Sequence, residues 1–221
     1  SGKTSSILYL FAPLLGQTDN KAWSSNTTSF VIRSLLSSTN AIPVVFGEFR
    51  VSTVHRQFLS VLRMAYDVGM DARGRPDLTV EVYPLTAPVV IDGEDALPEG
   101  ALKERSILVN LHPSDIAEGT MANRAFKALL RLPLNKFAGR YIRRTLRETP
   151  ESVQKRFDVA HEETFKLSRS ALPDRVRNNL AVVLVGLGMY NEHMARWGGK
   201  QISWEEDVFE EVLGSTLTTL L

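Results

Sequence analysis

The stretch Ala41-Ile42-Pro43-Val44-Val45-Phe46-Gly47-Glu48 places a short, valine-rich apolar run directly before a glycine and an acid. Its length, its β-branched residues and its flanking breakers predict a buried strand over Ala41–Phe46. Apolar residues at helical spacing lie on both sides of it, and they predict helices over Thr28–Ser38 and Val54–Val68. A buried strand between amphipathic helices is typical of an α/β sheet that is covered on both faces.

The same alternation continues outward from this strand. Leucine-rich residues predict a helix over Lys3–Leu15 that ends at Gly16. Three apolar runs of strand length predict strands at Leu78–Tyr83, Ala87–Ile91 and Ser106–Leu111, and the polar residues Asp71–Asp77 predict a loop. We therefore expect a mostly parallel α/β sheet over residues 1–113.

After Pro113 the pattern becomes helical throughout. Four or five segments are expected, with breaks near Pro133, Pro150, Pro173 and Gly198-Gly199. Residues 114–221 are therefore predicted to form an α-helical carboxyl-terminal region. No internal repeat or low-complexity tract interrupts it.

The composition excludes several classes of protein. The 221 residues include no cysteine, which rules out disulfides, thiolate metal sites and cysteine nucleophiles. The four histidines show no spacing typical of a metal site, and no run of 18 or more apolar residues could span a membrane. Without a targeting signal or cysteine, a cytoplasmic protein with no membrane association is expected.

The first residues match the end of a phosphate-binding loop. Gly2-Lys3-Thr4 fits the last three positions of G-x-x-x-x-G-K-[ST], and an apolar helix follows directly. In such a loop Gly2 lets backbone N–H groups approach phosphate, Lys3 reaches the β- and γ-phosphates of ATP, and the Thr4 hydroxyl binds Mg²⁺. The chain then begins inside its own loop, with the first strand of the sheet before Ser1. The alternative is a chance match, because the motif is short.

A P-loop ATPase also needs an acid at the end of a buried strand to activate water. Glu48 has this place, about 45 residues after Lys3. The position where a metal-orienting aspartate is usual is occupied by Gly47. The alternative is an ordinary buried strand whose first exposed residue is Glu48.

Further charged residues follow the later strands. Asp92 and Glu94 come after the strand ending at Ile91, where a polar residue could sense the γ-phosphate. Arg105 precedes the strand predicted at Ser106, and an arginine at a strand edge could reach the nucleotide of a neighbouring subunit. A turn with surface charges is the simpler alternative for these residues.

The charge distribution is uneven although the net charge is only +1. Eight basic residues and no acid lie between Met121 and Arg147, whereas Glu205–Glu211 is acidic. Arg140, Arg143, Arg144 and Arg147 recur at helical spacing and form a basic stripe that could contact nucleic-acid phosphates. A solvated helix face explains the stripe equally well.

The string LLSSTNAIPVVFGEFR at 35–50 resembles the acid-motif region of ATPase modules in primase–helicase proteins of phages, plasmids and integrated elements. The later strings AYD at 65–67, RGR at 73–75, YPLTAPVV at 83–90, GE at 93–94 and LKER at 102–105 are similar too. The resemblance covers about Gly2 to Leu111, with a weaker echo at Asn178–Tyr190. It implies an ATPase that follows an upstream domain in the same chain, assembles as a homo-oligomeric ring and moves along single-stranded DNA.

Within this resemblance Glu48 would be the catalytic acid and Arg105 the arginine that acts in trans. The family usually carries aspartate before the glutamate, so Gly47 leaves the capacity for hydrolysis open. The first interpretation is therefore the ATP-dependent motor domain of a replication-type DNA helicase or primase–helicase. The alternatives are a nucleotide-binding regulatory or structural module with weak hydrolysis, and a P-loop ATPase that acts on protein or packages DNA.

Overall fold

The structure of the chain is a computed structural model, and it describes residues 7–16, 22–54, 56–109, 117–168 and 172–203. The chain divides into two compact units. The first lies within Ser1–Leu102 and His112–Arg131, and the second within Lys103–Leu111 and Leu132–Leu221. The predicted domain boundary at residue 113 lies outside the described residues.

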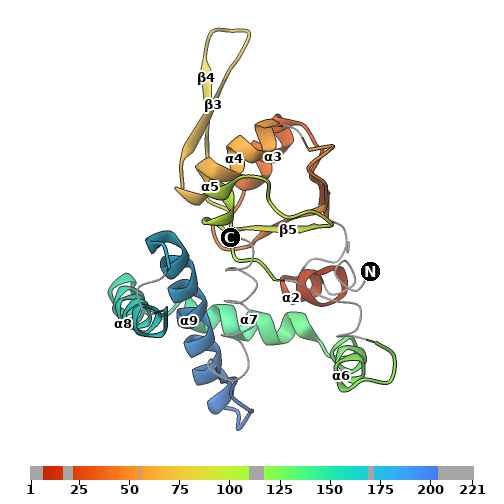
Figure 1. Cartoon of the computed structure of the whole chain (residues 1–221), viewed down its shortest axis with the longest axis vertical. Coiled ribbons are helices and arrows are strands. Elements are labelled where there is room, and N and C mark those ends of the chain that lie inside the picture. The colour runs from red at the N-terminus through yellow and green to blue at the C-terminus, as the bar shows by residue number, and fades with distance from the viewer. Residues whose placement is uncertain (1–6, 17–21, 55, 110–116, 169–171, 204–221) are drawn as a thin grey trace. The chain divides into compact units, whose positions relative to one another are not determined.

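The first unit is built on a small parallel sheet, as expected for an α/β fold. Strands β1 (Trp23–Ser24), β2 (Val44–Phe49) and β5 (Val89–Gly93) lie in the order β1-β2-β5, with both pairs parallel (Figure 1). The strand predicted at 41–46 begins only at Val44 and continues through Phe49. Pro43, which has no backbone N–H to donate, directly precedes it.

Helices connect the strands and cover the sheet. Helix α3 (Ser29–Leu36) joins β1 to β2, and α4 (Arg56–Tyr66) follows β2, so both predicted helices are confirmed. The Thr28 hydroxyl caps α3 by accepting a hydrogen bond from the Val31 N–H. The main core packs the inner faces of both helices against Val44, Phe46 and Phe49 of β2. Its other buried members include Ile32, Leu36, Phe58, Val61 and Leu102.

The amino-terminal segment is helical over its described part, as predicted. Residues Ile7–Phe11 form a π-helical turn (η1), and Ala12–Leu14 continue it as α2. The preceding residues, with the whole Gly-Lys-Thr motif, lie outside the described part of the chain. Two short helices complete this region of the sequence: α5 (Gly100–Lys103), and α6 (Met121–Leu129) with its Thr120 cap.

The loop predicted at Asp71–Asp77 is wrong. Met70–Gly74 form strand β3, which pairs with β4 (Val80–Pro84) in an antiparallel hairpin. The strand predicted at 78–83 therefore belongs to this hairpin and not to the parallel sheet. The turn is closed by the Asp77 carboxylate, which accepts hydrogen bonds from the N–H and hydroxyl of Thr79. The polar sequence gives no strand signal of its own, because β3 is stabilised by cross-strand contacts with β4.

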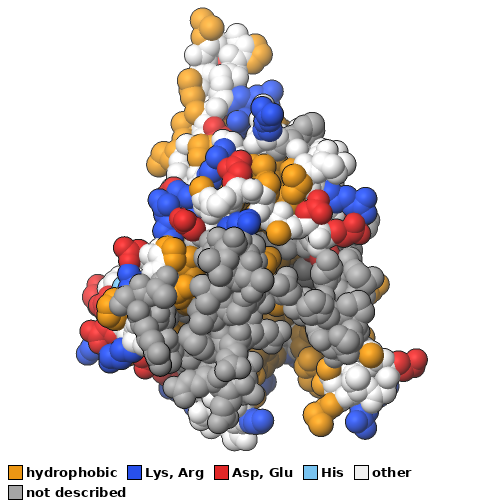
Figure 2. All heavy atoms as spheres, viewed as in Figure 1, with side chains coloured by type: hydrophobic (Ala, Val, Ile, Leu, Met, Phe, Trp, Pro, Cys, Tyr) orange, Lys and Arg blue, Asp and Glu red, His pale blue; other side chains and the backbone are white. Residues whose placement is uncertain are grey.

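The hairpin extends away from α3 and α4 (Figure 1), and its two faces differ. One face holds Asp71 and Tyr83, which meet α3 through the Arg33–Asp71 ion pair and the Phe30–Tyr83 ring contact. The opposite face is exposed and apolar: Met70, Val80 and Val82 are 75%, 64% and 53% exposed. Figure 2 shows hydrophobic side chains along this projection.

The strand predicted at Ser106–Leu111 is also wrong over its described part. Residues 106–109 form neither strand nor helix, and Ile107 and Val109 are exposed. A short apolar run becomes a strand only where a neighbouring backbone offers hydrogen bonds, and no described strand pairs with this one.

The second unit is helical, as predicted. It contains α7 (Leu134–Thr145), α8 (Pro150–Ser168) and α9 (Asp174–Ala195). Helices α8 and α9 lie side by side and bury Ala160, Ala181 and Leu184 between them (Figure 1). The breaks at Pro133, Pro150 and Pro173 fall at the starts of these helices, as expected. The acidic segment after Ser203 lies outside the described residues.

Candidate functional site

The carboxyl ends of the parallel strands bring several predicted residues to one edge of the sheet. Glu48 lies near the end of β2, the central strand, and Asp92 lies at the corresponding place on β5. Glu94 follows β5 directly. Because the carboxyl ends of parallel strands share one edge, this edge is where such a fold places ligands. We call it the acidic edge, and it comprises Glu48, Asp92 and Glu94.

The pairing of β2 with β5 is irregular at the acidic edge. Phe46 pairs with Ile91 and Phe49 with Gly93, so Gly47 and Glu48 together lie opposite the single residue Asp92. This is a β-bulge, a feature that is common beside active sites because it re-aims a side chain. The sequence contains no local signal for it.

Glu48 has an unusual backbone at this bulge. Its φ angle is +59°, in the left-handed region that residues other than glycine seldom adopt. Such a conformation costs about 1–2 kcal/mol and persists only when the surrounding structure enforces it. Its side chain is exposed whereas the other five residues of β2 are buried. A strained backbone that carries an exposed acid is typical of a functional position.

Asp92 differs from Glu48 in its surroundings. It is only 8% exposed and is one of the few buried polar residues among those described. The two carboxylates therefore have different environments on adjacent strands, one open to solvent and one enclosed. That difference suits different roles, since an exposed acid can accept a proton from water whereas an enclosed one serves orientation.

The backbone around the bulge is held by close contacts. A Cβ atom at Gly93 would lie 2.4 Å from the carbonyl oxygen of Phe49, so only glycine fits there. The N–H of Glu94 donates to that same carbonyl oxygen at 3.2 Å. Just after β1, the buried Ser25 donates its N–H to the Gly47 carbonyl at 3.2 Å and its hydroxyl to the Glu48 carbonyl at 3.3 Å.

Ser25 is a site residue that sequence reasoning missed. It lies just after a strand of two residues within a polar stretch, and a strand that short gives no periodic signal. Its two hydrogen bonds hold the carbonyls on both sides of the strained residue. Ser25 is therefore a positioning residue for Glu48.

Glu94 takes part in a surface contact. Its carboxylate forms an ion pair with Arg50 at 3.1 Å, and the two side chains are 69% and 56% exposed. Nearby, Asp95 accepts a hydrogen bond from the Val51 N–H at 2.8 Å. These contacts join the segment after β2 to the segment after β5. For Glu94 the surface-charge alternative describes the structure well, and Asp92 remains the stronger sensor candidate.

The other predicted residues of the nucleotide site come from two other parts of the chain. Gly2, Lys3 and Thr4 lie outside the described residues. Arg105 follows α5 in a turn and belongs to the second unit, and the described residues 106–109 after it do not form the predicted strand. In that unit the neighbouring Glu104 contacts α9, with its carbonyl accepting from Asn179 at 2.9 Å and its carboxylate 3.6 Å from Arg175.

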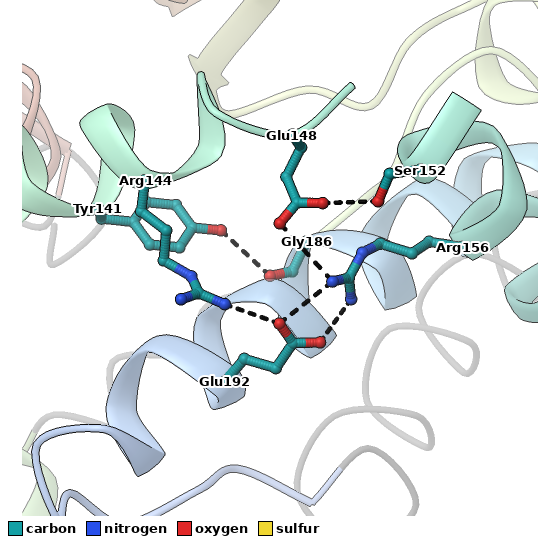
Figure 3. Close-up of polar contacts among 7 residues, drawn as sticks. All are labelled: Tyr141, Arg144, Glu148, Ser152, Arg156, Gly186 and Glu192. Carbon is teal, nitrogen blue, oxygen red and sulfur yellow. Dashed lines mark hydrogen bonds and ion pairs between the residues drawn. The ribbon is translucent and has the colours of Figure 1, made fainter. Parts of the chain in front are cut away.

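The predicted basic stripe is only partly available for a ligand. Arg140, Arg143 and Arg147 are exposed. The side chain of Arg144 is 15% exposed and donates to Glu192 of α9 at 2.8 Å (Figure 3), so the prediction that it faces a polyanion is not supported. Three cations remain on this face, and Arg140 lies over the ring of Trp197.

Arg144 belongs to an ion-pair network that joins three helices (Figure 3). Arg156 of α8 contacts Glu192 through both terminal nitrogens, at 2.5 and 3.2 Å, and lies 3.7 Å from Glu148. Glu148 accepts from the Ser152 hydroxyl at 2.6 Å. These cations hold the pKa of Glu192 below its usual value, and the hydrogen bond from Arg156 is the largest cause. The network is a structural clamp of the helical unit.

Alongside, Tyr141 donates its hydroxyl to the Gly186 carbonyl at 3.3 Å (Figure 3). Burial raises the pKa of this phenol. The ring of Tyr141 and that of Phe137 both meet the buried His193, at centroid distances of 5.7 and 5.6 Å. This histidine is a packed core residue.

No group of three or more potential metal ligands occurs among the described residues, and no described helix is long and apolar enough to cross a membrane. Glu48 and Asp92, on adjacent strands, are the residues of this edge that could hold Mg²⁺ together with phosphate, since Mg²⁺ commonly takes one or two protein carboxylates alongside phosphates and water. Comparisons with protein-family models, with curated proteins and with solved structures find no match for this chain.

Proposed function

We propose that this chain carries the ATPase core of a replication-type DNA helicase or primase–helicase, which hydrolyses ATP to move on single-stranded DNA. The observation that supports it best is the bulge in β2, where Glu48 is held at φ +59° at the carboxyl end of the central parallel strand, opposite Asp92. A P-loop ATPase needs a water-activating acid at this position in the sheet.

In this proposal each residue has a distinct task. Gly2, Lys3 and Thr4 bind the phosphates of ATP and its Mg²⁺, which supplies charge neutralisation when bound. Glu48 orients the attacking water and accepts its proton. Asp92, enclosed beside it, orients the metal or senses the γ-phosphate in place of the aspartate that is missing at position 47. Arg105 acts on the nucleotide of a neighbouring subunit.

The proposed partners follow from the family resemblance and the charge pattern. Single-stranded DNA, a ring of identical subunits and an upstream domain in the same chain are the features that this class of motor would have. The exposed cations Arg140, Arg143 and Arg147 are candidates for contact with the DNA backbone, which would make binding sensitive to salt.

A second candidate function is a nucleotide-binding regulatory module with weak hydrolysis. It is favoured by Gly47, because a side chain there would crowd Ala22 and the metal-orienting aspartate is therefore missing. A motor that acts on protein or packages DNA is the third reading of the same site. Stimulation by single-stranded DNA distinguishes the first proposal from both.

The test is ATP binding and hydrolysis by the longest protein that contains this chain, with and without single-stranded DNA. Parent protein should hydrolyse ATP and be stimulated by DNA. Lys3→Ala should lose nucleotide binding, whereas Glu48→Gln should bind nucleotide and lose turnover. Glu99→Gln, at a half-buried acid paired with Arg63, is the matched control and should behave as parent.

Three outcomes would count against this assignment. Unchanged nucleotide affinity in Lys3→Ala removes the phosphate-binding loop. Parent-level turnover in Glu48→Gln places the water-activating acid elsewhere. Tight binding by parent protein without turnover, with or without DNA, supports the regulatory module instead.

A further inference from the structure

The segment after β5 contacts the end of β2 and the residues that follow it in three ways. The Glu94 N–H donates to the Phe49 carbonyl at 3.2 Å, and the Glu94 carboxylate lies 3.1 Å from the guanidinium of Arg50. The Asp95 carboxylate then accepts a hydrogen bond from the Val51 N–H at 2.8 Å. We call these the strand-end contacts. They continue the association of β2 with β5 beyond the last residue pair of the two strands.

Among the strand-end contacts, the one made by Asp95 holds the backbone most directly after the bulge. An ion pair between two exposed side chains, such as Arg50 with Glu94, contributes little and does not fix one geometry. A hydrogen bond from a backbone N–H to a carboxylate is charge-assisted and directional. The bond to Asp95 therefore fixes the peptide group that joins Arg50 to Val51, two residues after Glu48.

The turn after β2 explains why this N–H needs an acceptor from elsewhere. The Arg50 carbonyl accepts hydrogen bonds from the N–H groups of Thr53 and Val54, which closes a turn directly after the strand. The N–H of Val51, the second residue of that turn, is not directed at the carbonyl that closes it. Asp95 accepts its hydrogen bond across the strand ends. Water could accept the same bond, but water would not tie the turn to the segment after β5.

Glu48 is therefore held from both sides. Ser25, just after β1, donates to the carbonyls of Gly47 and Glu48, while the strand-end contacts hold the next three residues from the side of β5. The φ of +59° at Glu48 is unfavourable by itself and persists only where surrounding contacts enforce it. Contacts on the carboxyl side of Glu48 are needed to stop the chain from relaxing to an ordinary extended conformation.

We propose that Asp95 is a positioning residue for Glu48. By accepting the Val51 N–H, it ties the end of β2 to the segment after β5 and keeps Glu48 in its strained conformation. The part that Glu48 plays in hydrolysis rests on the proposed function, whereas the hold on its backbone can be tested without nucleotide. Asp95 acts as a hydrogen-bond acceptor and not through its charge. Asparagine, whose amide oxygen accepts the same bond, should therefore replace it, and alanine should not.

The first test measures the strain at position 48 with and without Asp95. At φ +59° the Glu48→Gly variant should have a smaller equilibrium constant for unfolding than Glu48→Ala, by about fivefold. In an Asp95→Ala background this ratio should fall to about twofold or less, because the released chain can relax. In an Asp95→Asn background it should remain about fivefold. Denaturant unfolding of the full chain measures each ratio.

Asp77→Ala is the matched control for this comparison. The Asp77 carboxylate also accepts from a backbone N–H, that of Thr79 at 3.1 Å, but it closes the turn of the β3–β4 hairpin. Its removal should destabilise the fold and leave the glycine-to-alanine ratio at position 48 at about fivefold. Circular dichroism of each variant checks that the helices remain.

Hydrolysis of ATP by the longest protein that contains this chain is the second test. Asp95→Ala should lower kcat by about tenfold or more, because a small displacement of Glu48 misplaces the attacking water. It should leave KM for ATP within about twofold of the parent value, since the phosphate contacts are made by other residues. Asp95→Asn should restore most of the parent kcat, and Asp77→Ala should keep it.

Several results would overturn the proposal. The first is a ratio at position 48 that Asp95→Ala leaves unchanged, or that Asp77→Ala lowers equally. If Asp95→Asn behaves as Asp95→Ala does, the charge of Asp95 matters and its acceptor role does not. A parent-level kcat in Asp95→Ala would show that the hold on Glu48 does not serve hydrolysis. A parent protein that does not hydrolyse ATP removes the proposed function, but the unfolding ratios still decide whether Asp95 holds Glu48.

Discussion

Gly47 and Ala22 are in close contact: a Cβ atom at position 47 would lie 3.0 Å from the Cβ atom of Ala22. Such a distance is tighter than nine in ten real Cβ contacts, so a larger residue at 47 requires Ala22 to shift by a few tenths of an ångström. Packing beside β2 therefore explains why position 47 holds glycine and not the usual aspartate. Substitutions at positions 22 and 47 can therefore test whether packing or hydrolysis explains the glycine.

Gly47→Asp should therefore lower the free energy of unfolding by about 1–3 kcal/mol, as expected for overpacking, and should not raise turnover. Denaturant unfolding and steady-state hydrolysis would measure the two effects. The double variant Ala22→Gly/Gly47→Asp removes the crowding atom and should recover part of the stability. An increase in turnover by Gly47→Asp alone, without loss of stability, would contradict the packing explanation.

Much of the fold could be predicted from local patterns. The helices around β2 and the helical unit follow from apolar periodicity, and the proline breaks fall at helix starts. Strand β2 was recognisable because both of its faces are buried, which gives the continuous run Val44-Val45-Phe46. These features depend on residues that are close together in the sequence.

The errors have a common cause, which is pairing between distant segments. Met70–Gly74 is polar and becomes a strand only through its partner Val80–Pro84, whereas no described strand pairs with the apolar run at 106–109. The bulge at Glu48 likewise depends on the register against Asp92. The sequence could therefore predict Glu48 and Asp92 as candidate site residues. It could not predict the bulge that places Glu48 opposite Asp92.

The Glu192 clamp predicts how the helical unit responds to acid. The pKa of Glu192 is lowered in the folded state. The stability that its carboxylate contributes is therefore present above the unfolded pKa of about 4.3 and is lost as pH falls through the folded pKa. Glu192→Gln should therefore flatten the decline in unfolding free energy between neutral and acidic pH. The loss at pH 7 should be about 1 kcal/mol or less, because the carboxylate is 44% exposed and solvent screens it.

Unfolding followed by circular dichroism from pH 7 to acid would measure this effect. Glu162→Gln, at an exposed acid of α8 outside the network, is the control and should keep the parent slope. An equal slope for parent and Glu192→Gln would show that the clamp does not contribute to the pH dependence.

The proposed role of Arg105 between subunits predicts a large effect on rate alone. Arg105→Ala should bind ATP normally and hydrolyse it about 10³-fold more slowly, because the charge that an arginine finger stabilises develops in the transition state. Mixing it with Glu48→Gln protein should restore part of the activity, since some interfaces then contain both intact residues.

Arg175→Ala is the matched control, because it removes the contact to Glu104 next to Arg105 and leaves the guanidinium of Arg105 in place. It should keep most of the parent turnover. Absence of rescue in confirmed mixed assemblies, or a protein that is monomeric at every concentration, would argue against action in trans.

The strained backbone of Glu48 predicts a reversal of the usual preference between alanine and glycine. At an ordinary strand position glycine is less stable than alanine by about 0.5–1 kcal/mol. At φ +59° the Cβ atom carries the steric cost, so Glu48→Gly should be more stable than Glu48→Ala by about 1 kcal/mol. Both variants should lose turnover, because both remove the carboxylate.

The same pair of substitutions at the exposed strand residue Val82, which has an ordinary φ, should give the usual order of stability. Denaturant unfolding of the four variants measures the difference. If alanine is the more stable residue at position 48 as well, Glu48 is not held in a strained conformation, and the strongest structural support for its catalytic role is lost.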